Sequence, residues 1–155
     1  MGKEKPETLD DTKLRKAEKR RWNYLNGIIS NIIVFFIINL FPLWMPLTHG
    51  VVTGKWINAL WAMDLSIIVK VLGNILLISY SPKWFRAMIE FFITSAALIS
   101  ISVFFVVFPL DFSILTGPWL NTVIRCLLIA GIVGASIGTI VWLGRFLRSV
   151  SGFEK

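Results

Sequence analysis

Four long apolar runs divide the chain, and polar residues, prolines or glycines separate them. The runs cover residues 24–41, 56–80, 83–108 and 119–144. A helix rises about 1.5 Å per residue, so roughly 17–25 apolar residues are enough to cross a hydrocarbon core of about 30 Å. Each run reaches that length. The pattern therefore predicts an all-α integral membrane bundle of four transmembrane helices.

Local breakers set the expected ends of the spans. Pro42 and Pro46 are expected to end the first run, because proline lacks an amide donor and its ring clashes with the preceding helical turn. Ser81 suits a helix N-cap and Pro82 suits the first helical position. The second and third spans are therefore predicted to form a hairpin with a very short connection.

The composition agrees with a lipid environment. The 155 residues are 55% hydrophobic and only 16% charged. Soluble domains are typically about 45–50% apolar and about a quarter charged. A water-soluble core of this length would not bury so much apolar surface, whereas a bilayer removes the need to do so.

Basic residues gather on one side of the predicted spans. Eight of the sixteen Lys and Arg residues precede Asn23, two (Lys83 and Arg86) lie just after the connection between the second and third spans, and three follow the fourth. Only Lys55 lies on the opposite side. Because cytoplasmic flanks are enriched in Lys and Arg, we expect a cell-membrane protein with both termini in the cytoplasm. Its basic N-terminal tail would be residues 1–22, its transmembrane domain 23–148 and its C-terminal tail 149–155.

The net charge of +7 also raises the question of nucleic acid. The charge follows the membrane flanks, however, and no motif that reads or stacks on bases is present. We therefore expect the lipid bilayer as a partner and no nucleic acid.

Several polar residues interrupt the spans, where ionisable groups are costly and usually face the protein interior. The candidate intramembrane polar network consists of Asp64, Lys70, Asn74, Glu90 and Arg125. Asp64 and Arg125 lie at similar depths below the outer ends of their spans, which predicts an ion pair between them. Lys70 and Asn74, four residues apart, share a helix face that we expect to point inward. Depth also allows Lys70 to meet Glu90. Each group has two interpretations: a structural network between helices, or contact with a substrate or ion.

Other residues favour helix packing. Asn31 and Asn39 lie near one face of the first span, and asparagine in a membrane helix usually bonds to a neighbouring helix. The fourth span has small residues at Ala130, Gly134 and Gly138, and a Gly-x-x-x-Gly unit permits close approach of another helix. That helix could belong to the same chain or to a second copy.

The second outer loop, residues 109–117, contains Asp111. A short carboxylate side chain accepts hydrogen bonds from backbone amides two residues further on. We expect Asp111 to cap a turn through the amide of Ser113.

Residue combinations typical of catalysis are absent from the sequence. The single histidine and single cysteine leave no zinc motif, and no nucleophile with its base or phosphate-binding loop is present. We expect no enzyme, no catalytic residues, no cofactor and no metal. The pattern favours a non-enzymatic subunit or scaffold that contacts a second copy or another membrane protein through its helices. The alternative is a small oligomeric transporter or channel that uses the intramembrane polar residues.

Overall fold

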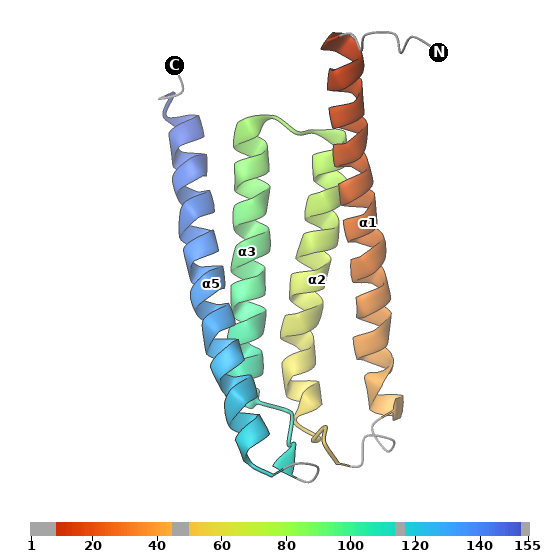
Figure 1. The fold of residues 1–155 in the computed structure, drawn as a ribbon, viewed down its shortest axis with the longest axis vertical. Coiled ribbons are helices and arrows are strands. Elements are labelled where there is room, and N and C mark those ends of the chain that lie inside the picture. Colours follow the sequence, from red (N-terminus) through yellow and green to blue (C-terminus); the bar gives the residue numbers. More distant parts are fainter. Residues whose placement is uncertain (1–8, 45–49, 114–116, 153–155) are drawn as a thin grey trace, which may run out of the picture.

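The computed structural model describes residues 9–44, 50–113 and 117–152. These ranges contain four long helices: α1 (Leu9–Trp44), α2 (Trp56–Ser79), α3 (Lys83–Val107) and α5 (Trp119–Val150). All four are long and apolar enough to cross a membrane. The predicted all-α membrane bundle is therefore confirmed, and the chain is a multi-pass membrane protein (Figure 1).

The first helix is longer than the first apolar run, residues 24–41. It begins at Leu9, within the predicted N-terminal tail, and its last residue is Trp44 rather than a residue before Pro42. The basic segment is rich in Lys and Arg, which are good helix formers, so the first turns extend the membrane helix. Residues 1–8 of the predicted N-terminal tail and 153–155 of the C-terminal tail lie outside the described residues.

The start of α3 at Lys83 agrees with the predicted run, but its cap differs from the expected one. Pro82 is the N-cap, with φ −65° and ψ 157°, and the first helical residue is Lys83. The predicted capping by Ser81 is thus shifted by one residue. An extended Pro82 keeps the α2–α3 connection short, and the two helices form the expected hairpin (Figure 1).

The helices stand in an open row. Within the described residues α1 contacts α2, α2 contacts α3 and α3 contacts α5, so every helix packs only on its neighbours along the chain. Figure 1 shows this row, with the start of α1, the α2–α3 connection and the end of α5 at the same end of the molecule. No residue of α5 is buried. Both broad sides of the row are therefore open.

An aromatic cluster joins three helices near the opposite end, which we call the outer end. The Trp56 ring of α2 lies 4.8 Å from Phe41 of α1 and 6.2 Å from Phe104 of α3, between ring centroids. Its indole nitrogen donates to the carbonyl of Ile38 at 3.4 Å. Trp56 is only 7% exposed, so one buried ring of α2 contacts both flanking helices on one broad side of the row.

The two outer connections pair with each other. Val52 and Leu110 form an isolated antiparallel bridge. The amide of Thr53 donates to the Pro109 carbonyl at 2.9 Å, and the amide of Asp111 donates to the Val51 carbonyl at 2.7 Å. These bonds tie the α1–α2 loop to the α3–α5 loop.

Candidate functional site: polar residues on one side of the helix row

Asp64 is bonded to α1. The side-chain amide of Asn39 donates to Oδ1 of Asp64 at 2.8 Å and also to the Phe35 carbonyl of its own helix at 3.0 Å. Asn39 therefore links two helices, as predicted. Asn31 behaves differently, because its side-chain amide bonds to the Gly27 carbonyl on α1 itself.

The predicted Asp64–Arg125 ion pair is wrong. The Arg125 guanidinium lies 4.4 Å from the ring centroid of Phe108, which is the C-cap of α3. Asp64 is on α2 and Arg125 on α5, and these two helices do not touch because α3 lies between them. A similar expected depth in the membrane carries no information about which helices are lateral neighbours.

Lys70 and Asn74 were predicted to share an inward face of α2, but of the two only Asn74 is buried. Asn74 is 9% exposed, and its Nδ2 lies so close to Gly27 of α1 that a Cβ built there would be 2.9 Å away. Lys70 is exposed. Within the described residues neither Lys70 nor Glu90 forms an ion pair, so the predicted inward position of Lys70 is wrong and the two charges do not meet within one chain.

Lys70 nevertheless lies on the side of α2 that carries Trp56. Met63 and Lys70 follow Trp56 at intervals of seven residues. A seven-residue repeat drifts by only about 20° per interval around a straight helix. Trp56 contacts Phe41 of α1 and Phe104 of α3 on one broad side of the row. Lys70 therefore projects from the same broad side.

The same side continues onto α3 and α5. Arg86 precedes Phe104 by eighteen residues, or about five helical turns, and Glu90 follows Arg86 by about one turn. Arg86 and Arg145 line one pocket, and Gly134 precedes Arg145 by eleven residues, about three turns. We call this the polar side of the row, defined by Lys70, Arg86, Glu90, Gly134 and Arg145.

The small residues of α5 divide between two directions. A Cβ built on Gly131 would lie 2.5 Å from Cδ1 of Ile101, and one on Gly138 would lie 3.9 Å from Cγ2 of Thr94, so both glycines face α3. Gly134 has nothing within 4 Å of the corresponding position, and Ala130 is exposed. The predicted Gly134–Gly138 unit is thus not a single packing surface. Gly138 packs within the chain, and Gly134 is open.

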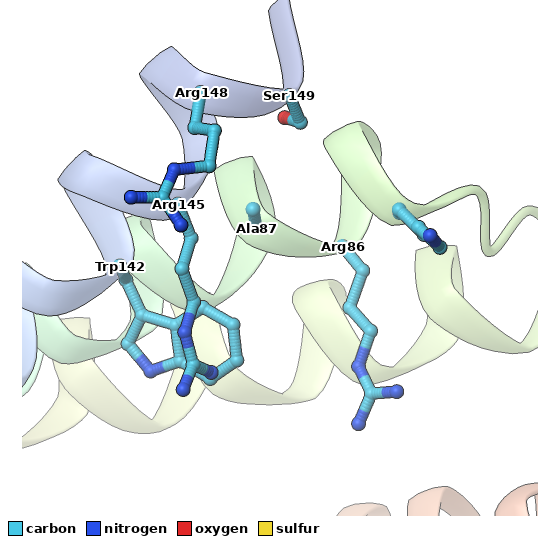
Figure 2. Close-up of a pocket in the computed structure, with 7 residues that line it drawn as sticks. Arg86, Ala87, Trp142, Arg145, Arg148 and Ser149 are labelled. Atoms are coloured by element: carbon cyan, nitrogen blue, oxygen red, sulfur yellow. The ribbon is translucent and has the colours of Figure 1, made fainter. Parts of the chain in front are cut away.

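A basic pocket lies between the start of α3 and the end of α5. It has a volume of about 410 Å³ and is lined by Lys83, Arg86 and Ala87 of α3 and Trp142, Arg145, Arg148 and Ser149 of α5. Figure 2 shows Arg145 across the Trp142 ring, which its guanidinium carbon approaches to 4.5 Å from the centroid. The signal for this pocket in the sequence is the spacing of its cations. Lys83 and Arg86, and likewise Arg145 and Arg148, are three residues apart at helix ends that lie at the same end of the row.

The outer loop forms a small hydrogen-bonded turn. Oδ1 of Asp111 accepts from the Ser113 amide at 3.0 Å, which confirms the predicted cap, and from the Ser113 hydroxyl at 2.6 Å. Asn121 of α5 also donates to Asp111 at 3.1 Å and accepts from the Phe112 amide at 2.9 Å. The Ser113 side-chain and backbone bonds, followed by the Asn121 bond, lower the pKa of Asp111. These short polar contacts make the turn structural.

Comparisons with protein-family models, curated proteins and solved structures give no match to this chain.

Proposed function

We propose that this protein is a non-enzymatic membrane subunit that assembles with a second copy of itself through the polar side of its helix row. The exposed mid-span position of Lys70 carries the proposal. A lysine at the centre of a membrane helix costs about 2.5–3.5 kcal/mol on insertion scales when lipid surrounds it. A protein surface that offers a carboxylate removes much of that cost.

Glu90 supplies the matching charge on the same side. Lys70 lies nine residues from the inner end of α2, about 14 Å, and Glu90 lies seven residues from the inner end of α3, about 11 Å. A twofold axis along the membrane normal brings equal depths of two copies together, and such an interface is self-complementary. Lys70 of one copy then pairs with Glu90 of the other, twice per dimer. Gly134 would let the two backbones approach closely on α5.

Charge reversal tests the pairing between copies. Chains carrying only Lys70→Glu, or only Glu90→Lys, should fail to self-associate because each interface then opposes like charges. Co-expressed with different tags, the two variants should associate with each other, since every contact in the mixed dimer again joins opposite charges. Lys55→Glu, which changes an exposed outer lysine, is the matched control and should leave self-association intact.

Chemical cross-linking in native membranes, followed by pull-down through one tag, measures each combination. Rescue in the mixed pair would support contact between copies, because a pair within one chain cannot be restored by mixing. Full self-association of both single variants would overturn the proposal.

A small oligomeric transporter or channel is the second candidate, and the same exposed lysine favours it. If Lys70 faces water between copies, Lys70→Met should change a measured ion or solute flux in proteoliposomes while leaving assembly intact. If the protein is instead a subunit without a transport function, Lys70→Met should abolish its assembly, irrespective of the ion or solute whose flux is measured.

A further inference from the structure

We propose that the basic pocket between α3 and α5 binds the phosphate headgroup of an anionic phospholipid. All lining residues come from a single chain, so the pocket is complete without a second copy, although Arg86 and Arg145 also belong to the polar side of the row. Four of them are cationic: Lys83, Arg86, Arg145 and Arg148. None of the described lining residues is acidic.

The arginines of the pocket are arranged to receive an acceptor. Nε of Arg86 is buried and has no hydrogen-bond partner in the described part of the chain. A buried polar nitrogen without an acceptor is costly, and a phosphate oxygen is an acceptor that arginine binds strongly. Arg145 is held against Trp142 by a cation–π contact, so its guanidinium loses less freedom when an anion arrives.

The location favours a lipid as the source of that phosphate. Tyr80 and Trp84 lie close to the α2–α3 connection, and Trp142 is one turn before Arg145, as expected of aromatic residues at the membrane–water interface. Basic pockets between membrane helices at the cytoplasmic side bind anionic headgroups. The predicted orientation puts this pocket in the cytoplasmic leaflet, where anionic lipids supply the charge.

Lipid titration of the purified full-length chain tests the site. The protein, delipidated in a neutral detergent, is titrated with phosphatidylglycerol or phosphatidylcholine, and bound lipids are counted by native mass spectrometry. We expect one retained phosphatidylglycerol at concentrations where phosphatidylcholine is not retained. Each basic residue near a charged lipid changes affinity by about fivefold, so Arg86→Gln with Arg145→Gln should weaken retention by about tenfold or more.

Matched variants separate the pocket from general positive charge. Arg20→Gln with Arg21→Gln removes the same charge from exposed positions of α1 and should change retention by less than about threefold. Arg148→Gln, a single change at an exposed pocket position, should also weaken retention. It keeps the test valid if the double variant does not fold.

Three results would overturn the proposal. They are equal retention of the two lipids, equal weakening by the α1 and pocket variants, and displacement of the lipid by millimolar glycerol phosphate or inorganic phosphate. The last result would assign the pocket to a soluble phosphate compound instead.

Discussion

Replacing Asn39 by leucine should loosen α1 from α2. The Asn39 amide donates to Asp64 at 2.8 Å, and this is a side-chain bond between two membrane helices. Hydrogen bonds to charged groups contribute about 1.5–3 kcal/mol, whereas polar contacts between membrane helices average about 0.6 and reach about 1.7 kcal/mol. Because Asp64 also loses its donor in the variant, we expect a loss of about 1–2 kcal/mol in the free energy of unfolding.

Asn31 provides the matched control on the same helix. Within the described residues its side chain bonds to the Gly27 carbonyl of α1 and to no other helix, so the variant loses no link between helices. Asn31→Leu should therefore change the free energy of unfolding by less than about 0.5 kcal/mol.

The assay is reversible unfolding in mixed micelles with increasing SDS, followed by circular dichroism. A double-mutant cycle with Asp64→Leu should give a coupling of about 0.6–1.7 kcal/mol between positions 39 and 64. Equal costs for Asn31→Leu and Asn39→Leu, or no coupling in the cycle, would refute this reasoning.

Two further predictions concern packing and the outer loop. Gly73→Leu should cost about 1–3 kcal/mol in the same assay, because a Cβ there would already lie 2.8 Å from Cδ1 of Ile93, whereas Gly144→Leu, in open space, should not. For Asp111, the lowered native pKa means that the ionised carboxylate stabilises the fold above its unfolded pKa of about 3.9. That stability is lost as the pH falls through the lower native pKa, and Asp111→Asn should remove this part of the acid dependence when unfolding midpoints at pH 6 and pH 3 are compared.

The spans were predictable because the bilayer imposes a length and a polarity on each helix. Turn chemistry was predictable at Asp111 because its partner is two residues away. The charged start of α1 consists largely of good helix formers, so the helix begins at Leu9, ahead of the first apolar run.

Lateral arrangement was not predictable from depth alone. Asp64 and Arg125 lie at similar distances along the chain from the starts of their helices, but the intervening α3 keeps these helices apart. The predicted inward position is confirmed for Asn74 and wrong for Lys70. Two residues on one helix face can differ in exposure, because the face does not determine how far a long side chain extends from it. The basic pocket was missed because its two halves lie far apart in sequence, near the start of α3 and the end of α5.

The mass of the protein in native lipid nanodiscs tests the central proposal most directly. We predict a dimer for the natural chain and for Lys55→Met, and a monomer for Lys70→Met, which removes the mid-span charge without adding another. A natural chain that is monomeric in these nanodiscs, or a Lys70→Met variant that remains dimeric, would contradict self-association through the polar side.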